Sequence, residues 1–172
     1  MRQSLVNLVY SGLVCFLTLS GILFSQDLVS RKDYNQTLSL IGQQRYDEAT
    51  KGLKQIIARD SLFYPAYLKI VEVSKYQSTL DAAEEYFSRA LTRTSDNPYL
   101  HHALGLIYRE RKEWQSAYQH ILKALQLNFR YYPAYRDFVS VNRSTEEAKH
   151  TIKQLLEKKP DIAAAYCGLA YI

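Results

Sequence analysis

The residue types best able to do chemistry in this sequence are four histidines and two cysteines. Histidine and cysteine side chains bind transition metals when they recur at short spacings, as in H-E-x-x-H or in paired cysteines. Neither spacing occurs here, and the adjacent His101 and His102 point in different directions on a helix. The sequence therefore predicts no metal site and no cofactor.

Two pairs of adjacent glutamates, Glu84–Glu85 and Glu146–Glu147, are the candidates for acid–base chemistry. Two carboxylates can act as general acid and general base when they face a common substrate. Both pairs fall where a helix is expected to begin, and acidic side chains there stabilise the positive end of the helix dipole. The chain also lacks a glycine-rich phosphate loop and a G-x-S-x-G motif. These patterns predict that the protein is not an enzyme.

Arginines are the remaining candidates, and their chemistry is recognition. A guanidinium can hold a carboxylate through two parallel hydrogen bonds, so arginines on a partner-binding face favour an acidic partner. The net charge of +5 is spread along a chain without runs of like charge. We therefore expect no nucleic-acid binding.

The N-terminal segment 1–26 differs from the rest of the chain. No charged residue occurs between Arg2 and Asp27, and the apolar run from Leu5 to Phe24 is long enough to cross a bilayer as a helix. A cleaved signal peptide and an uncleaved transmembrane anchor both fit this segment, and a core helix is a third interpretation. Either of the first two predicts a protein exported across, or anchored in, a membrane, on the periplasmic side if the source is bacterial.

A repeated tetrapeptide, YPAY at Tyr64–Tyr67 and again at Tyr132–Tyr135, reveals a shorter period. From Asp33 onward, apolar residues recur every three or four positions, which predicts helices of about a dozen residues. The segment that begins at Pro98 lies midway between the two tetrapeptides, so half of their offset is the repeat period. A fixed period of about 34 residues is typical of stacked helical repeats.

The pattern resembles the tetratricopeptide repeat family, whose unit of about 34 residues folds as two antiparallel helices. The resemblance covers about Asp33 to Ile172 and is clearest in the third unit, where residues match the family spacing: His101, Leu104, Gly105, Tyr108, Ala117, Ile121 and Ala124. It implies an all-α fold, a right-handed α-solenoid of antiparallel helix pairs, preceded by the apolar N-terminal helix. The expected repeats in the domain 27–172 are 30–63, 64–97, 98–131 and 132–162, with a fifth beginning at 163–172.

In this family, partners usually lie in the concave groove formed by the first helices of successive units. Carried onto this chain, the resemblance predicts that one face of each first helix lines the groove: Leu68, Glu72, Lys75, His102, Leu106, Arg109, Arg136, Ser140 and Arg143. Three of these residues, Arg109, Arg136 and Arg143, predict an acidic protein or peptide partner.

Three functions remain open from the sequence. The first is a non-enzymatic scaffold that binds a protein or peptide, exported or membrane-anchored. The second is a targeting arm of a longer enzyme or signalling protein, because the fifth unit has only its opening residues. The third is a surface binder of glycan or nucleic acid. Since stacked repeats need a polar cap at each end, the incomplete fifth unit also predicts self-association through its uncovered face.

Overall fold

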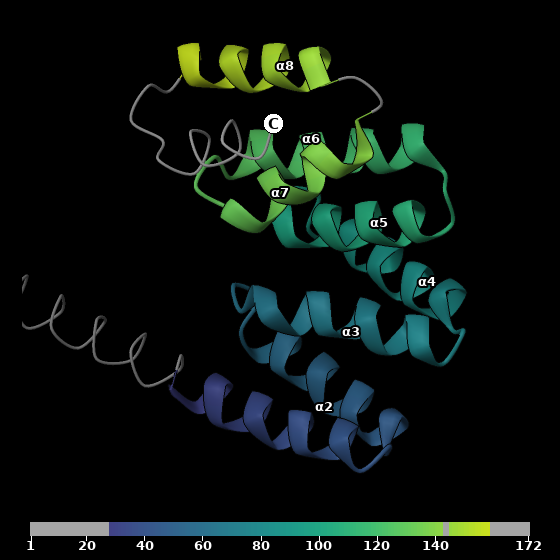
Figure 1. Ribbon diagram of the computed structural model, residues 1–172. Coiled ribbons are helices and arrows are strands. Elements are labelled where there is room, and N and C mark those ends of the chain that lie inside the picture. The colour runs from purple at the N-terminus through teal and green to yellow at the C-terminus, as the bar shows by residue number, and fades with distance from the viewer. Residues whose placement is uncertain (1–27, 143–144, 159–172) are drawn as a thin grey trace, which may run out of the picture. The chain divides into compact units, whose positions relative to one another are not determined.

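The computed structural model describes residues 28–142 and 145–158 (Figure 1). The predicted apolar segment 1–26 and the predicted fifth unit 163–172 lie outside these residues. All regular structure within them is α-helical, and none of their helices is long and apolar enough to cross a membrane. After a helix over residues 28–42, the order is α2 (Tyr46–Arg59), α3 (Tyr64–Tyr76), α4 (Leu80–Leu91), α5 (Pro98–Glu110), α6 (Trp114–Leu127), α7 (Tyr132–Val141) and α8 (Thr145–Lys158).

The chain divides into two compact units, Met1–Ala66 and Tyr67–Ile172. In the first, the helix over residues 28–42 packs closely on α2. A Cβ atom placed on Gly52 would lie 2.6 Å from the methyl group of Thr37, so only glycine permits this approach. Arg59 also reaches across to Asp33 at 2.7 Å.

The second unit contains the part of the chain that carries the candidate site. Its helices follow one another as hairpins, and α5 and α6 pack along their length (Figure 1). The ring of Tyr67 on α3 stacks on Phe87 of α4 with centroids 6.1 Å apart, and the core continues through buried Phe138 on α7 and Ile152 on α8. Apolar side chains at three- and four-residue spacing therefore build this core.

The turns inside the hairpins repeat with the same period as the sequence. Gln44, Ser78 and Lys112, each one repeat period after the one before, have φ angles of 60°, 59° and 64°. A left-handed residue at a helix end lets the following amide close back onto the last turn. That closing bond recurs in all three turns: Arg45 to Leu40, Thr79 to Ser74 and Glu113 to Tyr108, at 2.9, 2.8 and 2.9 Å.

The junctions before the two YPAY sequences are also alike. The side chain of Asp60 accepts a hydrogen bond from the amide of Leu62 at 3.2 Å, and Asn128 accepts one from Arg130 at 3.0 Å. Such Asx turns satisfy the backbone of a short connection. Pro133 then stands in the first turn of α7, where its missing amide hydrogen costs nothing.

The α5–α6 contact generates a test of the fold. A Cβ atom on Gly105 would lie 2.5 Å from Ile121 Cγ1 and 3.3 Å from the carbonyl oxygen of Ala117. Overpacking of this kind costs about 1–3 kcal/mol, more than the ~1 kcal/mol gained from alanine's helix propensity. Gly105→Ala should therefore lower the free energy of unfolding, measured by urea denaturation followed by circular dichroism.

Gly42→Ala is the matched control, because a Cβ atom there meets nothing within 4 Å. It should leave stability unchanged or slightly raised. Equal effects of the two substitutions would show that the close approach of α5 and α6 does not constrain the fold.

Candidate functional site

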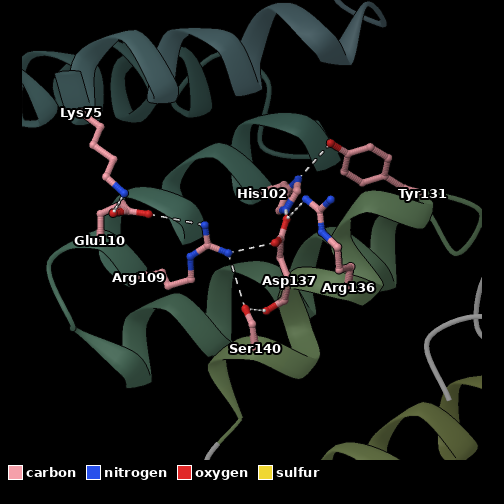
Figure 2. Close-up of polar contacts among 8 residues, drawn as sticks. All are labelled: Lys75, His102, Arg109, Glu110, Tyr131, Arg136, Asp137 and Ser140. Carbon is pink, nitrogen blue, oxygen red and sulfur yellow. Dashed lines mark hydrogen bonds and ion pairs between the residues drawn. The ribbon is translucent and has the colours of Figure 1, made fainter. Parts of the chain in front are cut away.

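A buried carboxylate, Asp137 on α7, lies at the centre of a polar network that joins α5 to α7 (Figure 2). Only 6% of its side chain is exposed. The imidazole of His102 meets one of its oxygens at 2.9 Å, and the guanidinium of Arg109 donates to the other at 2.9 Å. Arg136 reaches it from the same helix at 3.4 Å. Two arginines and one imidazole thus surround a single negative charge.

Both ring nitrogens of His102 have partners, and these fix its tautomer. Its Nδ1 lies 2.9 Å from the hydroxyl of Tyr131, while Nε2 faces Asp137. A carboxylate can only accept, so Nε2 carries the hydrogen and the tyrosine hydroxyl donates to Nδ1. Burial lowers the pKa of His102, although Asp137 acts in the opposite direction. The neutral ring therefore completes a hydrogen-bond chain from Tyr131 to Asp137.

The ionisation of Asp137 depends on these neighbours. Burial is the largest single influence on its pKa and by itself would raise it. The hydrogen bond from His102 and the charges of Arg109 and Arg136 outweigh burial and lower the pKa to about 2. Asp137 is thus a charged carboxylate throughout the physiological range.

The network extends from Arg109 to α3. The guanidinium of Arg109 lies 3.5 Å from the carboxylate of Glu110. Glu110 in turn forms an ion pair with Lys75 of α3 at 2.6 Å (Figure 2). Arg109 also donates to the hydroxyl of Ser140 at 3.5 Å. A row of alternating charges therefore runs over the first helices α3, α5 and α7.

The structure separates the residues predicted to line a groove into three groups. Glu72, Lys75, Arg136 and Ser140 are exposed, and Leu68 and Arg109 are partly buried. His102 and Leu106 are buried, with exposures of 0% and 8%, which corrects the prediction that their side chains face a partner. Residue 143 lies outside the described part of the chain. His102 is buried because its ring is the link between Tyr131 and Asp137.

Sequence reasoning missed three members of the network: Tyr131, Asp137 and Glu110. A signal for Asp137 was present in the repeat phase. The position one period earlier is the small apolar residue Ala103, so a carboxylate in the same phase departs from the repeat pattern. No comparable signal pointed to Glu110. Lys75, with which it forms an ion pair, had been predicted to contact a binding partner instead.

The glutamates singled out by the sequence have separate partners. Glu84 accepts a hydrogen bond from the hydroxyl of Tyr108 at 2.7 Å and from Arg111 at 2.5 Å. These bonds, that from Tyr108 first, lower the pKa of Glu84. Glu85 pairs instead with Arg89 along the same helix. Glu84 therefore joins α4 to α5, and the two carboxylates do not converge on one point.

No group of three or more histidines, cysteines and acidic residues in the described part of the chain is arranged to hold a metal ion.

Solved structures with little sequence similarity share this arrangement of helices. PilF of Pseudomonas aeruginosa matches with a TM-score of 0.52 and 18% identity, over 85% of this chain and 68% of its own. A tetratricopeptide repeat protein from Parabacteroides merdae matches with a TM-score of 0.51 and 16% identity, over 83% and 58%. MamA of Desulfovibrio magneticus matches with a TM-score of 0.50 and 13% identity, over 76% of this chain and 76% of its own. No family model and no curated protein matches the chain. At these identities the likeness concerns the fold.

Loss of the buried charge should destabilise the second unit. Asp137→Asn removes the charge that compensates Arg109, and breaking a buried ion pair from one side costs about 3 kcal/mol or more. The measurement is the midpoint of urea unfolding, followed by the fluorescence of Trp114, the one tryptophan of the chain. Asp81→Asn is the control, because the Asp81 side chain is 97% exposed, and it should cause no measurable loss. A loss no larger than that of the control would contradict the proposed role of Asp137.

Stability should also fall as the solution becomes acidic. Burial lowers the pKa of His101, His102 and His120 below 6.5, so the folded chain keeps these rings neutral while the unfolded chain protonates them. Their contribution is complete above pH 6.5 and declines below it, by at most about 1.4 kcal/mol per pH unit for each ring. The lowered pKa of Asp137 acts separately, below about pH 4, as the pH falls toward 2.

His102→Gln tests the share of one ring, because the amide can still donate to Asp137 and accept from Tyr131. The slope of unfolding free energy between pH 5 and pH 6.5 should become shallower than in the original chain. His150→Gln, on the exposed surface of α8, provides the background for replacing a histidine. An unchanged slope in the His102 variant would show that its protonation does not limit stability.

Proposed function

Because this chain has the fold of the tetratricopeptide repeat proteins, we propose that it is a non-enzymatic scaffold that binds a protein or peptide partner. The resemblance implies that partners lie against the first helices of successive units. In the second unit those helices are α3, α5 and α7. The exposed side chains of these three helices are thus the proposed contact surface.

The observation that carries the proposal is the charged row over these helices. Lys75, Glu110, Arg109, Asp137 and Arg136 together hold three positive and two negative charges. The buried bonds of Asp137 fix this row, so its outer members need little reordering when a partner binds. Such pre-ordered charges favour recognition of a complementary partner.

Two members of the row are exposed, Lys75 at 57% and Arg136 at 56%. Lys75 is held by Glu110 at 2.6 Å, whereas Arg136 approaches Asp137 only at 3.4 Å. Arg109 is 28% exposed and engaged by both Asp137 and Glu110. The sequence predicted that three arginines contact an acidic partner. We now assign the contact with a partner carboxylate to Arg136 alone. Arg109 instead holds the neighbouring carboxylates Asp137 and Glu110 in position.

We further propose that the repeats act beyond a membrane. The support is the sequence of residues 1–26, with an apolar run of membrane-spanning length behind a single basic residue. Cleavage of this segment or its retention as an anchor would both give that location.

The test uses the full chain against an array of peptides that differ in their content of Asp and Glu. Acidic peptides should be retained, and binding should weaken with added salt. Arg136→Ser should weaken it by about tenfold or more, the size of one charge-assisted hydrogen bond. Arg89→Ser is the control, since Arg89 is exposed on the second helix α4 and pairs with Glu85.

Circular dichroism of both variants establishes that helical content is intact. Equal binding by the two variants would show that the surface of α3, α5 and α7 is not the contact site. Retention of neutral and acidic peptides to the same extent would contradict the acidic partner.

A further inference from the structure

Two histidines outside the Asp137 network face each other across the α5–α6 hairpin. His101 lies on α5 and His120 on α6, and their Nδ1 atoms are 3.2 Å apart. The ring centroids are 5.3 Å apart and both side chains are partly buried. The contact therefore joins two helices that are already packed along their length.

The other nitrogen of His101 settles how its ring is protonated. His101 Nε2 lies 3.1 Å from the carbonyl oxygen of Ser95, which can only accept, so Nε2 carries the hydrogen. Tyr135, one repeat period later, makes the equivalent bond from its hydroxyl to the carbonyl of Phe129, also six residues back. In neutral His101 this leaves an unprotonated Nδ1, with its lone pair toward His120.

We propose that His101 and His120 together form a binding site for a divalent transition metal ion, with Zn²⁺ as its representative. Zinc binds imidazole nitrogen at about 2.0–2.1 Å, so two neighbouring ligands of a tetrahedral ion lie about 3.3–3.4 Å apart. The observed separation of 3.2 Å is close to this value, and the two rings must tilt so that both lone pairs meet at the ion. His120 donates from Nδ1 in the hydrogen-bonded pair, and on binding this proton moves to its Nε2, so both rings stay neutral. Water completes the coordination.

The surroundings of the pair suit this role. The bond from His101 to the carbonyl of Ser95 is the kind of outer contact that orients a metal-binding imidazole. Burial lowers the pKa of both histidines, which keeps them in the neutral form that a metal needs. The charges acting on the pair are Asp96 and Glu84, which favour a cation, and Lys123, which opposes it.

The site is specific to the third repeat. At the positions equivalent to His101 and His120, the second repeat has Tyr67 and Tyr86. The fold therefore accepts tyrosine in these places and does not need imidazole there for packing. With only two protein ligands, this is an open site and differs from the clusters of three or more ligands that hold structural metals.

The tyrosines at the equivalent positions of the second repeat suggest matched variants for the test. His101→Tyr and His120→Tyr introduce the residue that the second repeat carries, and the first variant can still donate to Ser95. The full chain is titrated with Zn²⁺ at pH 7.5 and followed by calorimetry and by the unfolding temperature. We expect saturable binding and a raised unfolding temperature, both reversed by EDTA and absent with Mg²⁺.

Each tyrosine variant should bind Zn²⁺ at least about tenfold more weakly. His150→Gln, which alters the exposed histidine of α8, should bind as the original chain does. Binding should also weaken at pH 5.5, where protons compete for the rings. Absence of saturable binding, or equal binding by all variants, would overturn the proposal and leave a hydrogen-bonded pair only.

A measurement on the unaltered chain keeps the test independent of folding of the variants. In the NMR spectrum of chain labelled with ¹⁵N-histidine, Zn²⁺ should shift the nitrogen signals of two rings together, with Nδ1 most affected. Shifts confined to a single ring, or to His150, would count against the pair as the site.

Discussion

The second unit depends on one constraint, the need to neutralise a carboxylate that the helices bury. Asp137 is removed from water between α5 and α7, and an isolated charge in that position would be very costly. Its compensation comes from His102 and Arg109 of the neighbouring helix, so both must be in place when α7 packs on α5. Apolar contacts hold the hairpins together, and the hydrogen bonds of Asp137 add directional contacts between α5 and α7. The surface charges proposed to meet a partner are held by the same bonds.

Adjacent residues on α5 perform different tasks. His102 has both ring nitrogens engaged, by Tyr131 and Asp137, and is sealed inside the unit. His101 points to another side of the helix and shares its second nitrogen with His120. His102 therefore has no ring nitrogen left for a ligand. The hydrogen bond between His101 and His120, by contrast, can be replaced by bonds to a metal ion. The helical geometry that separates successive side chains by about a third of a turn makes this division possible.

The helices and their connections were predictable because their signals are local. Apolar spacing, small residues and YPAY set the repeat phase, and α3, α5 and α7 begin at Tyr64, Pro98 and Tyr132. The polar network was harder to predict from the sequence, because the burial of a polar group depends on the side chains of another helix. The repeat phase alone predicted that His102 lies on an exposed face. In the structure its ring is buried and bonded to Asp137 on the next first helix. The pairing of His101 with His120 likewise depends on the packing of α5 on α6.

The two Asx turns show that the connections between repeats are stabilised in two different ways. They precede the two YPAY sequences and are two repeat periods apart, at Asp60 and Asn128, whereas the intervening junction begins α5 differently, with Asn97 capping the helix. Alternate junctions are thus more alike than successive ones. The connections before α3 and α7 are therefore held by a side chain within the turn, and the connection before α5 by one at the start of the helix.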